Sequence, residues 1–219
     1  MQTWAIVVAA GGGARFGGAK QFAPLGDSTV VDRSVAIARS ACDEAVVVVP
    51  ADAEWRPPAG VRVAPGGATR SDSVRAGLAC VPVDVDVVVV HDAARPLASP
   101  QLFARVIAAV RDGADGAVPA LPIADTVKRV RDRVVVETVP RGDLVAVQTP
   151  QAFRRDALER AHAGDAVDTD DAALVEANGG TVRIVEGERR NLKLTLPGDL
   201  EVARALLDGP AVTTESGQG

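Results

Sequence analysis

The sequence has little cysteine, no excess of positive charge and no long apolar run, and each shortage argues against a class of protein. Its only two cysteines, Cys42 and Cys80, lack the CxxC spacing of a metal or redox site. We interpret both as unpaired thiols in a reducing compartment, which predicts a cytoplasmic location. A net charge of -5 argues against a broad nucleic-acid-binding surface, so any basic patch must be local.

The first apolar run is too short to cross a membrane and follows no basic leader, so we interpret it as a core strand and not a signal peptide. With 47% hydrophobic and 24% charged residues, the composition is that of a globular protein rather than a disordered one. A chain of 219 residues is long enough to bury a substantial core in one large domain.

Valine-rich runs alternate with amphipathic segments in the first half of the chain. Nearly continuous apolar runs at 5–10, 45–49 and 85–90 are typical of buried parallel strands. Between them, 28–41 and 69–80 have helical spacing, and each begins with a residue that can cap a helix. This order predicts an α/β fold with a doubly wound, mostly parallel sheet.

The rest of the chain continues the alternation and interrupts it once. Two β-like runs joined by the charged turn RDR predict an inserted β-hairpin arm over Asp125–Thr138, within about 122–140. One domain is expected over 1–209, followed by a disordered tail at 210–219. The other expected elements are strands at 61–64, 116–120 and 181–185, helices at 100–111, 154–163 and 169–177, and a last helix from Pro197.

The stretch VVAAGGGARFGGAKQF, residues 7–22, leads from a strand into a glycine loop that carries Arg15 and Lys20. Glycine lets a ligand approach backbone N–H groups, and an arginine and a lysine beside such a loop suit a polyphosphate. The dinucleotide-binding GxGxxG pattern does not fit because of Phe16, and the P-loop does not fit because Ala19 stands where its lysine is required. The alternative is a glycine turn with two solvated cations.

A second cluster, PGGATRSDSVRAGL, begins at Pro65. The backbone of Gly66 and Gly67 and the hydroxyl of Ser73 could hydrogen-bond a base. The alternative is that Ser73 supplies only a hydroxyl at the start of a helix.

A third cluster, HDAARP, follows the buried valine run. Ligands of doubly wound sheets bind beyond the carboxyl ends of the strands, where Asp92 is expected to lie. An aspartate there could hold Mg²⁺ or a substrate hydroxyl, unless it pairs locally with Arg95. For His91 we expect packing or hydrogen bonds with its neighbours rather than catalysis.

Seven stretches occur in an order and at a spacing typical of one enzyme family: AAGGGARFGGAKQ, PGGATRSDSV, HDAARP, ADTVKR, VPRGDLVAVQTPQAF, TDDAALVE and LKLTLPGDL. Together they resemble the 2-C-methyl-D-erythritol 4-phosphate cytidylyltransferase family of non-mevalonate isoprenoid biosynthesis. The resemblance implies a nucleotidyltransferase with a Rossmann-like fold that joins CTP to 2-C-methyl-D-erythritol 4-phosphate, giving 4-diphosphocytidyl-2-C-methyl-D-erythritol and pyrophosphate. It further implies a requirement for Mg²⁺ or another divalent cation and a homodimer that exchanges its β-arms.

The resemblance also implies roles for individual residues. Arg15 and Lys20 would bind the triphosphate and stabilise the transition state, and Lys193 would approach the phosphate under attack. Their chemistry suits a reaction in which an ionised phosphate attacks and no side chain serves as nucleophile. Backbone contacts to the substrate would come from Ala9, Ala10, Gly11, Gly12, Gly13 and Ala93.

The remaining implied contacts concern the base, the metal and the acceptor. Gly67 and Ser73 would lie near the cytosine. Asp92 would contact both the substrate and the metal ion. Thr126 and Arg141 would bind methylerythritol phosphate in the site of the partner subunit. Without the resemblance, Thr126 would belong to a solvated basic hairpin.

Three rival functions share some of these features. A cytidylyltransferase for another polyol phosphate, such as ribitol 5-phosphate, would differ in its acceptor, and a sugar-nucleotide pyrophosphorylase has similar chemistry and a similar loop. A regulatory or assembly protein could sense CTP and use its arm only for dimerisation. In such a sensor, Asp92, Thr126, Arg141 and Lys193 would have no purpose. No nucleic-acid or membrane partner is expected.

Overall fold

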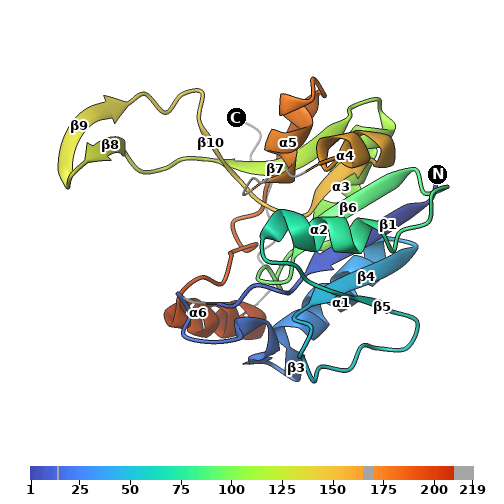
Figure 1. Cartoon of the computed structure of the whole chain (residues 1–219). Coiled ribbons are helices and arrows are strands. Elements are labelled where there is room, and N and C mark those ends of the chain that lie inside the picture. Colours follow the sequence, from blue (N-terminus) through green and yellow to red (C-terminus); the bar gives the residue numbers. More distant parts are fainter. Residues whose placement is uncertain (14, 165–169, 210–219) are drawn as a thin grey trace.

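The computed structural model describes residues 1–13, 15–164 and 170–209 (Figure 1). The predicted disordered tail at 210–219 lies outside these residues, as does the first residue of the helix predicted at 169–177. In the described part of the chain, no helix combines the length and the apolar character needed to cross a membrane.

Within the described residues, an eight-stranded sheet forms the centre of the molecule. Its strands are β1 (Thr3–Val8), β4 (Glu44–Val49), β5 (Arg62–Pro65), β6 (Val87–Asp92), β7 (Gly116–Pro122), β10 (Val145–Val147), β11 (Gln151–Arg154) and β12 (Val182–Glu186). They lie in the order β10-β7-β11-β6-β1-β4-β5, and β12 pairs with β7. Strand β1 pairs in parallel with β4 and β6, whereas β10 and β11 run antiparallel to their neighbours. The predicted mostly parallel sheet is confirmed.

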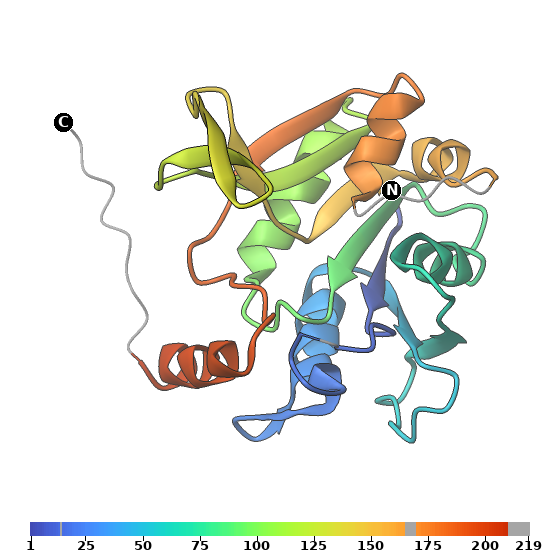
Figure 2. The same ribbon diagram turned by 60° about the vertical axis from the view of Figure 1, so that its left-hand side comes forward.

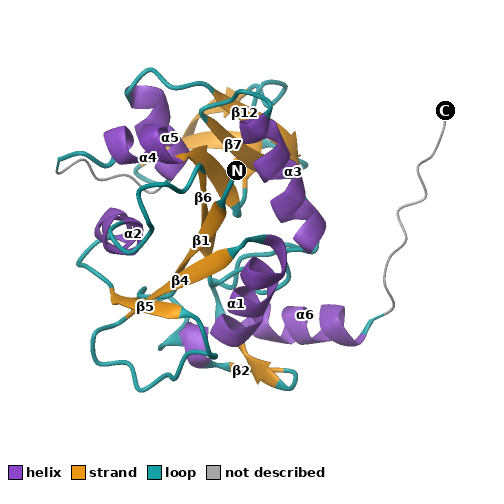
Figure 3. Ribbon diagram, turned by 90° about the vertical axis from the view of Figure 1, so that its right-hand side faces the viewer, coloured by secondary structure: helices purple, strands orange, loops and turns teal. Residues whose placement is uncertain are grey.

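Helices cover both faces of the sheet, on opposite sides in Figure 3. Helices α1 (Val30–Ala41) and α3 (Pro100–Arg111) pack with the side of β1 that carries Ala5 and Val7. Helices α2 (Arg70–Leu78), α4 (Arg155–Ala161) and α5 (Asp171–Ala177) pack with the side that carries Trp4 and Ile6. Successive side chains of a strand point to opposite faces, so the apolar residues at every position of β1 after Thr3 are what two helical layers require.

The predicted β-hairpin arm is confirmed. Strands β8 (Val127–Arg131) and β9 (Val134–Val139) pair antiparallel and project away from the sheet (Figure 1). The turn between them consists of Asp132 and Arg133, whose φ angles are 48° and 65°. Positive φ at both central residues is the conformation of a tight hairpin turn that matches the twist of the strands.

Three parts of the sheet differ from the prediction. Strands β10 and β11 were not predicted, and Arg154 ends β11 instead of beginning a helix. The buried part of β11 is too short to show a hydrophobic period, although it inserts between β6 and β7. The end of β1 was also misplaced: the strand stops at Val8, so Ala9 and Ala10 lie in the loop that follows.

The last helix, α6 (Pro197–Asp208), begins at the predicted proline and lies apart from the sheet (Figure 2). It packs beside the small hairpin of β2 (Pro24–Leu25) and β3 (Ser28–Thr29). Leu25, Val30, Leu194 and Ala203 form a separate apolar cluster there. The segment that joins β12 to α6 therefore runs from the sheet to this separate cluster, in which Leu194 packs.

Candidate functional site

The glycine loop leaves β1 and folds back on itself. Gly13 has a φ of +63°, and a Cβ atom there would lie 1.9 Å from the carbonyl oxygen of Gly18, so only glycine fits. The carbonyl oxygen of Gly13 accepts hydrogen bonds from the N–H groups of Phe16 and Gly17. By contrast, a Cβ atom at Gly11 or Gly12 would meet nothing within 4 Å. The loop is thus held by Gly13 and open at the two preceding glycines.

The second glycine cluster packs against the loop that follows β1. A Cβ atom at Gly66 would lie 2.2 Å from the Cβ atom of Ala10. The hydroxyl of Ser73 donates to the carbonyl oxygen of Thr69 at 3.1 Å and accepts from the N–H of Gly67 at 3.3 Å. Thr69, with Asp72, forms the capping box of α2. The Ser73 hydroxyl therefore ties the glycine turn to the helix, as in the structural alternative considered for it.

Asp92 lies at the end of β6 between two cations. Its carboxylate is 2.6 Å from Nζ of Lys193 and 3.3 Å from Nε of Arg70. Burial alone would raise the pKa of Asp92, but Arg70 and Lys193 hold that pKa well below its usual range. The alternative of a local ion pair with Arg95 is not what the structure has, because the side chain of Arg95 donates to backbone carbonyls instead.

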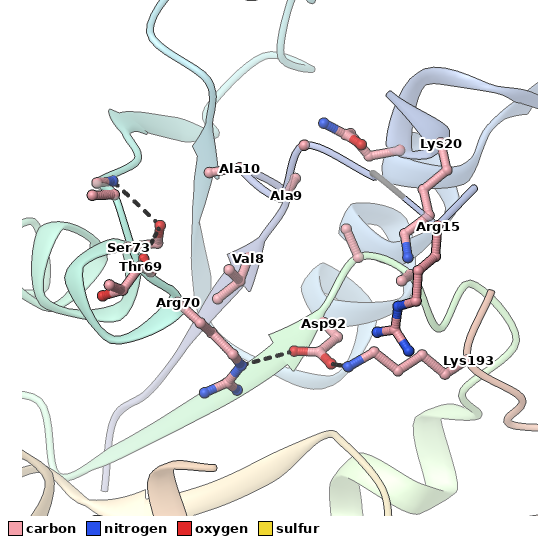
Figure 4. A pocket seen from close by; sticks show the side chains of 17 residues that line it. Val8, Ala9, Ala10, Arg15, Lys20, Thr69, Arg70, Ser73, Asp92 and Lys193 are labelled. Atoms are coloured by element: carbon pink, nitrogen blue, oxygen red, sulfur yellow. Dashed lines mark hydrogen bonds and ion pairs between the residues drawn. The ribbon is translucent and has the colours of Figure 1, made fainter. Parts of the chain in front are cut away.

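Lys20 lies beside Arg15 and Lys193 on the same side of the cavity (Figure 4). Its Nζ donates to the carbonyl oxygen of Leu194 at 2.6 Å. Burial, together with the charges of Lys193 and Arg15, lowers the pKa of Lys20. Mutually repelling cations of this kind are relieved when an anion binds between them.

These elements enclose a cavity of about 310 Å³ at the carboxyl end of β1 and β6. Ser73 and Thr69 lie on the side opposite Arg15, Lys20 and Lys193 (Figure 4). The predicted site residues that line it are Ala9, Ala10, Gly11, Gly12, Arg15, Lys20, Gly67, Ser73, Asp92, Ala93 and Lys193. Residues far apart in the sequence thus meet in one place.

A smaller cavity of about 180 Å³ adjoins this one and shares Arg70, Asp92 and Lys193 with it. Its other lining residues are Arg95, Val147, Gln148, Thr149, Gln151 and Asp170. The two cavities therefore meet at the ion pair between Asp92 and Lys193.

The structure does not bring every predicted residue to the cavity. In the described part of the chain, Gly13, Thr126 and Arg141 are absent from its lining. Thr126 and Arg141 are exposed at the base of the arm, where a guanidinium nitrogen of Arg141 donates to the carbonyl oxygen of Ala124. A role for either residue in substrate binding stays a prediction.

Arg70, the first residue of α2, was missed as a site residue. Besides Asp92, its guanidinium pairs with Asp171 at 2.7 Å, and the other carboxylate oxygen of Asp171 is 2.9 Å from Nε2 of His162. Asp171 and His162 are both buried. The sequence held one signal, since Arg70 stands within the PGGATRSDSV motif directly after a capping threonine.

The expectation that His91 packs within the fold is confirmed. The ring is fully buried against Phe103, with its centroid 5.1 Å from that of the phenyl ring. Its two nitrogens lie 3.2 Å from the carbonyl oxygen of Arg95 and 3.2 Å from the hydroxyl of Thr149. Burial lowers the pKa of His91 to about 4, so the ring is neutral at pH 7.

The cysteines also agree with the prediction. Cys42 and Cys80 are both free thiols, and Cys42 is buried. Burial raises the pKa of Cys42 to about 12, which leaves an unreactive thiol rather than a nucleophile.

The donor set of the cavity fits a metal ion that arrives with a polyphosphate. Among the described residues, no group of three His, Cys, Asp or Glu side chains is arranged to hold a metal ion, and Asp92 is the one carboxylate that lines the larger cavity. Mg²⁺ in phosphoryl-transfer sites is commonly held by one or two carboxylates together with substrate phosphates. Asp92 could provide such a ligand.

Comparisons with known proteins agree with the resemblance. The family model described as IspD, 2-C-methyl-D-erythritol 4-phosphate cytidylyltransferase, matches residues 3–209. Proteins with that enzyme name from Nocardia farcinica and Rhodococcus jostii are 46% identical over 217 residues and 45% identical over 214 residues. The alignments cover 93% of this chain and of the Nocardia protein, and 93% of this chain and 94% of the Rhodococcus protein.

A solved structure has the same fold. The crystal structure of 2-C-methyl-D-erythritol 4-phosphate cytidylyltransferase from Thermus thermophilus matches with a TM-score of 0.83 at 37% sequence identity. The match covers 94% of this chain and 98% of that chain. With the family model spanning nearly the whole length, this chain belongs to the 2-C-methyl-D-erythritol 4-phosphate cytidylyltransferase family.

Proposed function

We propose that this protein transfers the cytidylyl group of CTP to the phosphate of 2-C-methyl-D-erythritol 4-phosphate and releases pyrophosphate. The observation that carries the proposal is the meeting of Arg15, Lys20 and Lys193 around a cavity at the end of β1 and β6. In a protein with a net charge of -5, such a local group of cations favours a highly charged anion. Membership of the family supports CTP as that anion and methylerythritol phosphate as the acceptor.

In this proposal the triphosphate occupies the larger cavity. Arg15 and Lys20 bind the phosphate oxygens and neutralise the charge that develops on pyrophosphate as it leaves. The open backbone at Gly11 and Gly12 leaves room for phosphates to approach, together with backbone contacts from Ala9, Ala10, Gly13 and Ala93. A bound anion also relieves the repulsion that lowers the pKa of Lys20.

The base is proposed to lie at the opposite end of the cavity, near Gly67 and Ser73. Because the Ser73 hydroxyl already bonds Thr69 and Gly67, its main part would be to hold the glycine turn. Recognition of cytosine would then depend on backbone groups of that turn. Base selectivity is therefore expected to survive Ser73→Ala better than Gly67→Val.

The acceptor is proposed to approach from the smaller cavity, because Asp92 and Lys193 line both cavities. Its phosphate is already ionised at neutral pH, so the chain needs no nucleophilic side chain. Lys193 would neutralise the attacking phosphate and the α-phosphate, which otherwise repel each other. Mg²⁺ or another divalent cation, held by Asp92 and phosphate oxygens, would supply further neutralisation.

We further propose a homodimer in which the arm of each subunit completes the site of the other through Thr126 and Arg141. Two observations support it: the arm projects away from its own sheet, and its valines are exposed (Figure 1). The proposal includes a cytoplasmic location, which two free thiols support.

The test is pyrophosphate release by the purified protein with CTP and Mg²⁺. Methylerythritol 4-phosphate is compared with ribitol 5-phosphate as acceptor, and ATP, GTP and UTP are compared with CTP. The proposal predicts release only with CTP and methylerythritol phosphate. Preference for ribitol phosphate would overturn the acceptor, and no release with any pair would favour a nucleotide sensor.

A further inference from the structure

Lys193 lies on an irregular segment rather than on a helix or a strand. We call residues 187–195, between β12 and α6, the strap. The ammonium group of Lys193 is 2.6 Å from the carboxylate of Asp92. The Lys193 side chain is nevertheless 43% exposed, so packing against the side chain does little to fix its position. Because the two proposed anions must be aligned closely, the location of this amine depends on what fixes the strap.

The anchor of the strap nearest to Lys193 on its N-terminal side is Asn191, two residues before it. Asn191 is fully buried, and its Nδ2 donates to the carbonyl oxygen of Thr149 at 2.8 Å and to Oε1 of Gln148 at 3.3 Å. Its own carbonyl oxygen accepts from the guanidinium of Arg95 at 2.8 Å. Both the side chain and the backbone of Asn191 are therefore bonded to the end of the sheet.

Gln148 holds the same segment from its other side. Its Oε1 accepts from the N–H of Glu188 at 3.0 Å, while its Nε2 donates to the carbonyl oxygens of Glu188 at 2.9 Å and Asn191 at 3.3 Å. The N–H of Glu188 needs an acceptor, so Oε1 of Gln148 must face it, and this determines the orientation of the Gln148 amide. With Oε1 in that position, Asn191 must present its Nδ2 donor to Gln148. The two amides thus specify each other.

Beyond Lys193 the strap is bonded again. The N–H of Leu194 donates to the carbonyl oxygen of Ala94 at 2.8 Å, and the Leu194 carbonyl oxygen accepts from Nζ of Lys20. Lys193 therefore lies between two anchors, one at Asn191 and one at Leu194. The Leu194 anchor uses only backbone groups of the strap. Asn191 is therefore the side-chain anchor nearest to Lys193 along the strap, because the bonds of Glu188 to Ser99 and Arg105, and of Arg190 to the carbonyl oxygen of Leu206, lie farther from it.

We propose that Asn191 is a positioning residue for the proposed cytidylyl transfer, because it fixes the strap so that the Lys193 amine reaches both cavities. Asn191 does not line the larger cavity in the described structure, and the proposal gives it no contact with the substrate. This inference rests on the proposed function for its kinetic consequence. Its structural part, the location of the Lys193 amine, can be measured without any substrate.

The first test is a double-mutant cycle of Asn191→Ala and Lys193→Ala, measured by pyrophosphate release. A displacement of about 1 Å in a group that aligns the reactants can lower the rate of reaction about 100-fold. Asn191→Ala, which frees the strap to move the Lys193 amine, should therefore lower kcat about 10- to 100-fold. In the Lys193→Ala background the same substitution should lower kcat less than about twofold, because the amine that it positions is absent. An equal loss in both backgrounds would overturn the proposal.

Two further variants control for folding. Asn178→Ala removes the same kind of bond at an exposed position away from the strap, from the amide of Asn178 to the carbonyl oxygen of Leu174 at 2.9 Å, at the end of α5. It should leave kcat unchanged. Gln148→Ala removes the bonds that hold Glu188 and Asn191 to Gln148 without substituting Asn191 itself, so it should reproduce the kinetic loss if Asn191→Ala fails to fold. A folded Gln148→Ala variant with wild-type kcat would contradict the proposal.

The second test measures how readily Lys193 reacts with an amine-modifying reagent, by mass spectrometry of the folded protein. Lys128, on the exposed arm, is the internal reference. Asn191→Ala should raise the modification of Lys193 severalfold relative to Lys128, because the amine no longer rests against Asp92. Unchanged modification would overturn the positioning role. If the wild-type protein released no pyrophosphate, the proposed function would fail and this measurement alone would decide the role of Asn191.

Discussion

The cavity and the arm carry the predicted site residues, and they are built in opposite ways. Asp92 is 8% exposed and bonded to two cations that come from distant parts of the chain. In the arm, Val130, Val134 and Val135 are each more than half exposed, and Thr126 and Arg141 are exposed as well. One region is fixed by the core of its own chain, whereas the other presents apolar side chains to the surroundings.

Because of this difference, substitutions in the two regions are expected to change stability and activity in different proportions. Substitutions behind the cavity should lower both stability and activity, because they leave buried charges without partners. Substitutions in the arm should lower activity while changing the stability of the chain little, since exposed positions contribute little to it. Each of the following predictions separates these two outcomes.

Replacing Arg70 should have the largest effect. Arg70→Ala leaves the fully buried Asp171 without its guanidinium partner and removes one of the cations beside Asp92. Breaking a buried ion pair on one side typically costs about 3–5 kcal/mol in unfolding free energy. Urea denaturation measures this loss. Arg160→Ala, which breaks an exposed pair with Asp156, is the control and should cost less than about 1 kcal/mol.

Replacing Lys20 should affect activity without affecting the fold. Lys20→Ala should lower turnover about 100- to 1,000-fold, the usual loss when one charge-stabilising group is removed. Circular dichroism should remain that of the wild type, because the lysine side chain is only partly buried. Arg39→Ala, on the exposed surface of α1, is the matched loss of one cation. Normal turnover or an unfolded Lys20→Ala protein would refute the assignment.

The buried imidazole ring of His91, the residue before Asp92, should make the stability of the protein fall at acid pH. The pKa of His91 is about 4 in the folded protein and 6.5 when exposed, so the unfolded chain takes up the proton first. Stability from the neutral ring is complete above pH 6.5 and is lost as the pH falls towards 4. The loss reaches about 3 kcal/mol there. Urea unfolding at several pH values should show a shallower dependence for His91→Gln, and an unchanged dependence would contradict the account.

Replacing Arg141 should have a smaller and more selective effect. Arg141→Ala should raise the KM for methylerythritol phosphate about 10- to 100-fold, the loss expected for a hydrogen bond to a charged group. The affinity for CTP, measured by calorimetry, should not change. The unfolding free energy should change by less than about 0.5 kcal/mol. A comparable loss of CTP affinity would mean that Arg141 acts through the cavity of its own chain.

The sequence predicted the elements whose pattern is long and periodic. The valine runs of β1, β4 and β6 face helices on both sides, and α3 has the predicted bounds. Strand β11 was missed because a strand of four residues shows no period, and the antiparallel insertion beside β6 depends on contacts distant in sequence.

The sequence predicted many of the residues that line the site, but not the ion pairs and hydrogen bonds that hold them in place. Motifs identified the glycine loop, Asp92 and Lys193, all of which contribute to the lining of the cavity. They did not predict that Asp92 pairs with Arg70, or that Gln148 and Asn191 hold the strap, because those bonds join segments 22 and 43 positions apart. Hydrogen bonds of this kind leave no periodic trace in a sequence.

The most direct measurement mixes two impaired variants, Lys20→Ala and Arg141→Ala, and follows pyrophosphate release at a low concentration of methylerythritol phosphate. If each arm completes the site of the partner subunit, a mixed dimer has one site in which both the cavity and the arm are intact. Random exchange should then restore about a quarter of the wild-type activity. No recovery, with mixed dimers verified by mass, would contradict the claim that the cavity and the arm of one site come from different chains.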